Sequence, residues 1–141
     1  MIRYLDTSLI VAALTNEART EDVQQWLGKQ PARVLALSEW VVTEFSAALS
    51  IKLRTGQIEA GNRADALTAF AQIIADNVVM LPVHSAHFRS AARFADLHNL
   101  GLRAGDALHL AVASDHGATV CTLDVKLAAA GSEVGVKTLL L

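Results

Sequence analysis

Short apolar runs with β character alternate with helical segments along this chain. The first pair is the run Ile2–Leu5, followed by apolar residues at helical spacing between Leu9 and Leu14. Strands that alternate with helices favour a mostly parallel sheet covered by helices on both faces. We therefore expect an α/β fold, a three-layer α/β/α sandwich with a mostly parallel central sheet.

The alternation continues to the end of the sequence, with no internal repeat and no linker, so we expect a single domain over residues 1–141. Strands are predicted at Ile2–Leu5, Arg33–Leu37, Val78–Val83, Thr119–Leu123 and, at a sheet edge, Lys137–Leu140. Helices are predicted over 9–14, 20–27, 38–54, 59–75, 85–98, 104–116 and 125–130. Ser38 is expected to cap the third of these helices.

Composition supports a globular protein. Hydrophobic residues make up 52% and charged residues 18% of the 141 positions, which is enough to build one well-formed core. The single cysteine, Cys121, cannot close an intramolecular disulfide, so a reducing cytoplasm is the expected setting. No apolar run reaches the ~18 residues of a membrane helix, and no membrane association is expected.

The net charge is slightly acidic. Twelve basic residues face fourteen acidic ones, for a formal charge of −2, which argues against a broad basic surface for nucleic acid. Without the four acids singled out below, ten acidic residues face the twelve basic ones and the remainder carries +2. The charge therefore leaves room for a nucleic-acid partner whose binding depends on a cation in an acidic site.

Four acidic residues stand where the pattern calls for apolar ones or at strand ends. Asp6 and Asp124 each follow a predicted strand, although each could also be a helix N-cap. Glu44 shares its helix face with apolar neighbours, where a solvated glutamate is unusual. Asp106 opens a helix on its buried side, and the alternative there is an acid that compensates the helix dipole.

If these carboxylates converge, they repel one another. At about 5 Å and an effective dielectric near 20, each pair costs roughly 3 kcal/mol. Hard divalent cations compensate such a cluster directly, and Mg²⁺ or Mn²⁺ suits a carboxylate site without His or Cys. Bound ions of this kind activate water and neutralise charge on a phosphoryl group. The residues thus indicate hydrolysis of a phosphodiester.

The sequence also resembles the PIN-domain family, and within it the VapC-type toxins of bacterial toxin–antitoxin pairs. The resemblance rests on four short motifs in series, whose order and spacing cover essentially the whole chain. The motifs are Tyr4-Leu5-Asp6-Thr7-Ser8, then Ser38 with Glu44-Phe45, then Asp106-Ala107-Leu108-His109-Leu110-Ala111, and Thr122-Leu123-Asp124 with Lys126-Leu127.

The resemblance implies a ribonuclease that requires Mg²⁺ or Mn²⁺ and has a parallel-sheet α/β/α fold. By position, the acidic quartet would be Asp6, Glu44, Asp106 and Asp124, with Asp6 and Asp106 as direct metal ligands. The hydroxyls of Ser8 and Thr122 would support the metal or the phosphate. It also implies an antitoxin protein that blocks the groove, and a homodimer.

Other side chains receive weaker interpretations. Arg103 is the preferred phosphate-contacting cation and Lys126 the second. His109 could orient Asp106 or reach phosphate, although simple packing is the more common role. Trp40 could stack on a base, with packing or a dimer contact as the alternative. His84 and His87 are interpreted as surface residues at a helix start.

Two other functions compete with the nuclease. A non-catalytic nucleic-acid-binding protein could keep the same fold. A small phosphatase could use Asp6 as a covalent nucleophile, but that scheme usually needs a second acid two residues on, where this chain has Ser8. Metal dependence of RNA cleavage separates the three.

Overall fold

The computed structural model describes residues 1–141. Five strands and seven α-helices alternate in chain order, with one short 3-10 helix, η1 (His98–Leu100). The strands are β1 (Arg3–Leu5), β2 (Leu35–Ser38), β3 (Val79–Leu81), β4 (Thr119–Thr122) and β5 (Thr138–Leu140). The helices are α1 (Thr7–Leu14), α2 (Thr20–Gly28), α3 (Glu39–Arg54), α4 (Ala60–Asp76), α5 (Ser85–Ala95), α6 (Ala104–Asp115) and α7 (Val125–Glu133).

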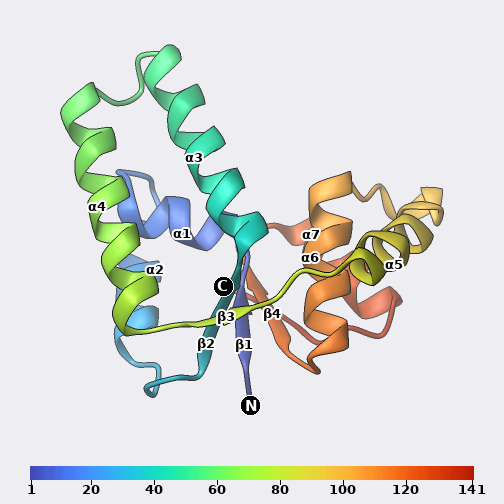
Figure 1. The fold of residues 1–141 in the computed structure, drawn as a ribbon. Coiled ribbons are helices and arrows are strands. Elements are labelled where there is room, and N and C mark those ends of the chain that lie inside the picture. Colours follow the sequence, from blue (N-terminus) through green and yellow to red (C-terminus); the bar gives the residue numbers. More distant parts are fainter.

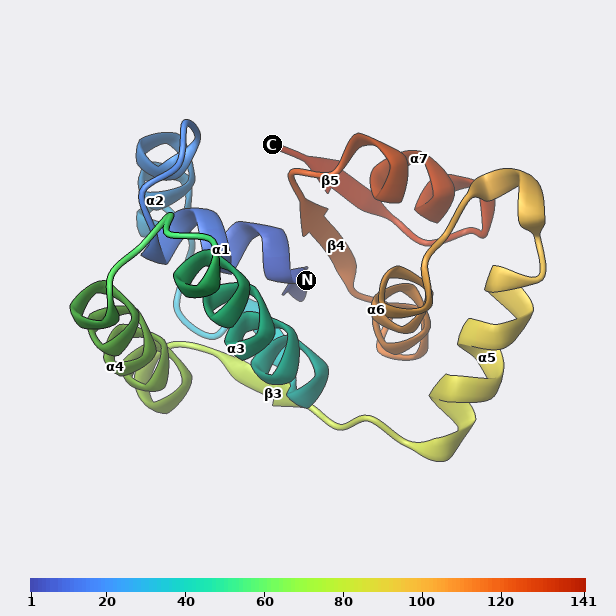
Figure 2. The same cartoon turned by 90° about the horizontal axis from the view of Figure 1, so that it is seen from above.

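The strands form one sheet in the order β3-β2-β1-β4-β5, and every neighbouring pair is parallel. The helices fall into two groups, α1 to α4 on one side and α5 to α7 on the other (Figures 1 and 2). The expected α/β sandwich with a parallel sheet is confirmed, and β5 lies at an edge as predicted.

The strand order reverses direction at β1. The chain leaves β1 toward β2 and β3 on one side, and returns to β4 on the other side of β1. In open α/β sheets such a switch point leaves a crevice at the carboxyl ends of the two central strands, where ligands bind. Here that crevice is expected at Asp6, directly after β1, and at Thr122, the last residue of β4.

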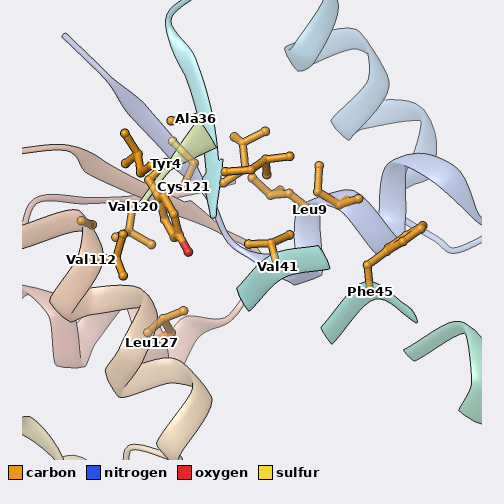
Figure 3. Close-up of a cluster of buried hydrophobic side chains, with 14 of the residues drawn as sticks. Tyr4, Leu9, Ala36, Val41, Phe45, Val112, Val120, Cys121 and Leu127 are labelled. Carbon is orange, nitrogen blue, oxygen red and sulfur yellow. The ribbon is translucent and has the colours of Figure 1, made fainter. Parts of the chain in front are cut away.

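A cluster of 28 buried residues fills the space between the sheet and the helices. Figure 3 shows part of it, with Val41 and Phe45 of α3, Val112 of α6 and residues of the strands. Tyr4 is fully buried in this cluster and brings a hydroxyl into it. A buried hydroxyl needs a hydrogen-bond partner, and that need leads to the site described below.

Two helix ends and one helix cap differ from the prediction. Helix α5 ends at Ala95, because Leu97 leaves helical geometry before η1. Helix α7 continues past Ala130 to Glu133 and includes Gly131. The missing side chain of Gly131 lets the helix pack closely against β5, since a Cβ there would lie 2.4 Å from Cγ2 of Thr138. Ser38 stands at the N-cap of α3, but its side chain makes no capping bond.

None of the helices is both long enough and apolar enough to cross a membrane.

Candidate active site at the carboxyl ends of the strands

Asp6 lies at the end of β1 and is buried, with 4% of its surface exposed. It is the N-cap of α1, since Oδ1 accepts from the backbone N–H of Leu9 at 3.3 Å. Two hydroxyls also donate to the carboxylate: Ser8 to Oδ1 at 2.6 Å and Thr122 to Oδ2 at 2.5 Å. The capping role and an inward-facing carboxylate therefore coexist in one residue.

The two hydroxyls tie the ends of β1 and β4 together. Ser8 Oγ accepts from the backbone N–H of Leu123 at 3.2 Å, and Thr122 Oγ1 accepts from that of Asp124 at 2.9 Å. Burial raises the pKa of Asp6, although the hydrogen bonds from Ser8 and Thr122 act to lower it. The structure thus places Ser8 and Thr122 on Asp6, in a position that orients its carboxylate.

Glu44 lies on α3, and its side chain is 29% exposed. Its Oε1 accepts from the hydroxyl of Thr7 at 2.6 Å and from Nε2 of His109 at 2.5 Å. Burial acts to raise the pKa of Glu44, but the hydrogen bond and charge of His109 and the Thr7 hydroxyl outweigh it, so the pKa lies below its ordinary value. Glu44 is thereby kept as a carboxylate.

His109 is the centre of a buried hydrogen-bond chain. Its Nδ1 lies 2.7 Å from the hydroxyl of Tyr4, which lies 2.7 Å from Oγ of Ser38. Because a carboxylate only accepts, Nε2 of His109 donates to Glu44. On its other side the Tyr4 hydroxyl is shared between Nδ1 of His109 and the hydroxyl of Ser38. The side chain of Ser38 thus contacts Tyr4 rather than the first turn of α3.

Asp106 lies in the first turn of α6 and is half-buried. Unlike the three other acids, it has no hydrogen bond or ion pair with the rest of the protein. Burial raises its pKa and the charge of Asp124 adds to that, His109 acts in the opposite direction, and Glu44 and Asp6 raise it by smaller amounts. The four carboxylates are therefore close enough to interact electrostatically, and Asp106 is the one without a hydrogen-bond or ion-pair partner.

Asp124 is exposed and caps α7, accepting from the backbone N–H groups of Lys126 and Leu127 at 2.9 and 3.2 Å. Lys126 is exposed beside it. Arg103 is exposed at the N-cap of α6, three residues before Asp106. Neither cation forms an ion pair within the protein.

Gly105 packs directly against the acidic site. A Cβ at this position would lie 2.7 Å from Oε2 of Glu44 and 3.2 Å from Nε1 of Trp40. That indole N–H is the one buried side-chain donor or acceptor in the protein without a partner. The lack of a side chain at position 105 lets α6 approach α3 closely enough for His109 to reach Glu44.

The sequence did not predict the hydrogen bonds that hold Glu44. Thr7 and Tyr4 belong to the quoted motifs but have no predicted role, Ser38 is predicted only as a helix cap, and His109 contacts Glu44 rather than Asp106. The only available signal was position: Tyr4 and Ser38 stand at or near strand ends, where polar atoms that line a site gather.

Histidine and carboxylate also meet outside this site. The ligand atoms of His87, Asp115 and His116 lie within 4.8 Å of one another, and no three of the quartet do so. The interpretation of His87 as a surface residue was wrong: it is 4% exposed, because it packs between α5 and α6 and binds a carboxylate 28 residues away.

Proton positions argue against a metal at this second cluster. Nδ1 of His87 accepts from the backbone N–H of His84 at 2.9 Å, so the ring proton is on Nε2, which donates to Oδ2 of Asp115 at 2.9 Å. A metal ion on Nε2 would leave the ring without any proton while the backbone bond persists. His87 and Asp115 are therefore a hydrogen-bonded link between α5 and α6.

The acidic quartet fits a divalent cation better than the cluster of His87, Asp115 and His116 does. Its donors are all carboxylate oxygens, the ligands that Mg²⁺ and Mn²⁺ prefer. Asp106 has no hydrogen-bond partner in the protein, and its pKa is raised by burial and then by neighbouring negative charge. A cation would relieve that repulsion and would explain why the acids gather at this edge of the sheet.

The structure thus defines a parallel α/β protein with an acidic site at its topological switch point. The sequence matches the PIN domain over residues 3–132, and the chain belongs to the PIN domain family. No curated protein sequence matches the chain.

Solved structures share the fold. FitAcB from Neisseria gonorrhoeae is 22% identical, with a TM-score of 0.72 over 98% of this chain and 96% of that one. VapC20 from Mycobacterium tuberculosis, described as a sarcin–ricin loop cleaving toxin, is 23% identical, with a TM-score of 0.73 over 92% and 95% of the two chains. VapBC2 from Rickettsia felis, bound to promoter DNA, is 17% identical, with a TM-score of 0.68 over 100% and 99%.

Proposed function

We propose that this protein is a ribonuclease that requires Mg²⁺ or Mn²⁺ and is the toxin of a toxin–antitoxin pair. The observation that carries the proposal is Asp106, a half-buried carboxylate without a protein partner whose pKa is raised by burial and then by the charge of Asp124. A site built in this way gains stability when a cation enters it.

In this proposal Asp6 and Asp106 hold the ion, and Glu44 and Asp124 complete the negative site. When bound, the ion supplies an activated water and neutralises charge on the phosphoryl oxygens. Ser8 and Thr122 fix the orientation of Asp6 by donating to both of its oxygens. His109 and Thr7 hold Glu44 ionised, with Oε2 left free to act toward the reaction centre.

The exposed cations have a place in the same scheme. Arg103 precedes Ala104 at the start of α6, and Lys126 follows Asp124 at the start of α7. Both side chains are free of ion pairs, so each can contact a phosphate of the RNA on either side of the cleaved bond.

The proposed partners follow from the relatives. VapC20 is described as cleaving the sarcin–ricin loop, and VapBC-5 from Mycobacterium tuberculosis as a member of the VapBC family of toxin–antitoxin systems. We infer an RNA substrate and an antitoxin protein for this chain as well. A homodimer and action in the cytoplasm belong to the same proposal.

The test is RNA cleavage by the purified protein under titration with Mg²⁺ or Mn²⁺. Asp6→Asn and Asp106→Asn should each abolish cleavage with the fold intact by circular dichroism. Metal-dependent cleavage by either variant would refute the assignment. Hydrolysis of a phosphate monoester instead would favour the phosphatase, and RNA binding without any turnover would favour the non-catalytic protein.

A further inference from the structure

Glu44 is held by only one of its two carboxylate oxygens. Oε1 accepts from the hydroxyl of Thr7 at 2.6 Å and from Nε2 of His109 at 2.5 Å, whereas Oε2 accepts no hydrogen bond within the protein. A carboxylate can accept on both of its oxygens. With one oxygen unbound, the carboxylate can still turn about the other, so Thr7 and His109 alone do not set the direction of Oε2.

A buried donor without a partner lies on the same helix. The indole N–H of Trp40 is the one buried side-chain donor or acceptor in the protein that makes no hydrogen bond. Trp40 and Glu44 are four residues apart on α3, so they share a face of the helix. Helical side chains lean toward the preceding turn, and Glu44 therefore extends back toward Trp40.

Gly105 of α6 marks the place where the two groups meet. The three atoms nearest to a Cβ built on Gly105 are Oε2 of Glu44 at 2.7 Å, and Nε1 and Cζ2 of Trp40 at 3.2 and 3.5 Å. The edge of the indole that carries the N–H thus borders the same gap as Oε2, which is the one acceptor among these atoms. The donor and the acceptor that both lack partners face one place in the structure.

Both groups gain from a hydrogen bond between them. Buried donors are almost always satisfied. Because Glu44 is kept as a carboxylate, the bond would be charge-assisted, and such bonds are about twice as strong as those between neutral groups. Hydrogen bonds in active sites without a ligand are often long or poorly aligned, and an adjustment of these two side chains closes this one.

We propose that Trp40 is a positioning residue for Glu44, and that its indole N–H donates a hydrogen bond to Oε2. The carboxylate is then held on both oxygens, and an acceptor site of Oε2 stays open toward the reaction centre. Trp40 touches neither the cation nor the RNA and acts only through Glu44. The proposal rests on the proposed ribonuclease function and adds to it a residue that fixes the direction of one of the four acids.

The first experiment detects the hydrogen bond itself, in EDTA and without RNA. The protein has two tryptophans, so two indole ¹H–¹⁵N signals are expected, and Trp26→Phe assigns them. Glu44→Gln replaces the charged acceptor with a neutral one, so the proton signal of Trp40 should move upfield. Glu39→Gln, the same change at the exposed glutamate directly before Trp40, is the matched control and should leave the signal in place. An equal response to both variants, or no response to either, would overturn the proposal.

The second experiment tests what the bond does in the acidic site. Trp40 is replaced with benzothienylalanine, which keeps the shape of the ring but has sulfur in place of the N–H. Groups that orient metal-binding side chains contribute about 10- to 100-fold to metal affinity, so calorimetry should show a roughly tenfold loss of Mn²⁺ affinity. In Glu44→Gln the same replacement should cause no further loss, because the two residues act together. The same replacement at Trp26, on α2 beside Arg3, is the control, with the wild-type affinity expected.

The outcomes separate this inference from the function beneath it. If benzothienylalanine leaves the Mn²⁺ affinity unchanged, or lowers it equally in Glu44→Gln, the indole of Trp40 only packs and the inference is wrong. If Glu44→Gln binds no Mn²⁺, the same comparison is made on the free energy of unfolding in urea with EDTA, where the replacement should cost stability only when Glu44 is present. A wild-type protein that neither binds Mn²⁺ nor cleaves RNA would refute the ribonuclease, and the indole signal would still decide the hydrogen bond.

Discussion

Nε2 of His109 on α6 lies 2.5 Å from Oε1 of Glu44 on α3, although 65 residues separate them in the chain. The two helices belong to the two groups that flank the sheet, so this contact joins them at the edge where the acidic residues gather (Figure 2). The geometry of Glu44 is therefore set by the packing of the whole protein rather than by α3 alone.

Replacing His109 with alanine should weaken catalysis without removing any of the four acids. Groups that orient metal-binding side chains typically contribute about 10- to 100-fold to activity or metal affinity. We expect a loss of cleavage in that range, with weaker Mn²⁺ binding measured by calorimetry.

Tyr4→Phe is the matched variant for this prediction. It keeps the bond between His109 and Glu44 but leaves Ser38 and Nδ1 of His109 without their partner. It should lower the free energy of unfolding by about 1–3 kcal/mol, with a smaller loss of cleavage than His109→Ala. Equal losses of cleavage in the two variants would contradict the role given to the histidine.

Asp106→Asn should stabilise the metal-free protein. Burial and the charge of Asp124 raise the pKa of Asp106 above its ordinary value of 3.8, so the folded state binds this proton more tightly than the unfolded state. The contribution of Asp106 to stability then falls as pH rises from 3.8 through the raised pKa. In urea unfolding across pH 3.5–8, the free energy of unfolding of the variant should rise relative to that of the wild type over that interval. A constant difference would argue against the proposed repulsion.

Divalent cations should raise the thermal unfolding temperature of the wild type. An ion at 100 times its dissociation constant stabilises the state that binds it by about 2.7 kcal/mol. Melting curves with Mg²⁺ and Mn²⁺, each against EDTA, test this expectation. Asp106→Asn should lose most of the shift, whereas Asp115→Asn, in the cluster assigned no metal, should retain it.

Gly105→Ala should impair the site through a single methyl group. Its Cβ would lie 2.7 Å from Oε2 of Glu44, so the carboxylate or the helix must move. We expect at least a tenfold loss of cleavage, because a misplacement of 1 Å can cost about 100-fold. Gly61→Ala on α4 is the control, since a Cβ there meets nothing within 4 Å and should leave activity unchanged.

Gly131→Ala should destabilise the fold where α7 packs against β5, the edge strand of the sheet. Its methyl would lie 2.4 Å from Cγ2 of Thr138 and 3.1 Å from Cδ2 of Leu110. Overpacking of this kind costs about 1–3 kcal/mol. The double variant with Thr138→Ser removes the closer atom and keeps the hydroxyl bond to the carbonyl of Ala128, so it should recover part of the loss. Additive effects in urea unfolding would rule out the contact as the cause.

The sheet could be predicted because its signals are local. Each strand is a short apolar run, and Asp6 and Asp124 stand at strand ends that any parallel sheet brings to one edge. The hydrogen bonds that hold Glu44 could not be predicted, because the partner of His109 depends on how closely α6 approaches α3. That approach is set by Gly105, a residue with no distinguishing pattern of its own.

The contact between His87 and Asp115 could not be predicted from the sequence for the same reason. His87 and Asp115 are 28 residues apart and meet only because α5 and α6 pack side by side. Spacing along the chain made His87 look like a surface residue of one helix. A contact between two helices leaves no periodic trace in either of them.

The bond between Asp6 and Thr122 spans 116 positions of the sequence. On the ribosome, the carboxylate of Asp6 is made 116 residues before the hydroxyl that orients it, and Asp124 follows two residues after that hydroxyl. A chain interrupted anywhere before β4 therefore lacks the means to assemble the site. Under the proposed function, strand order alone withholds RNA cleavage until β4 has been synthesised, so products that stop before β4 are inactive.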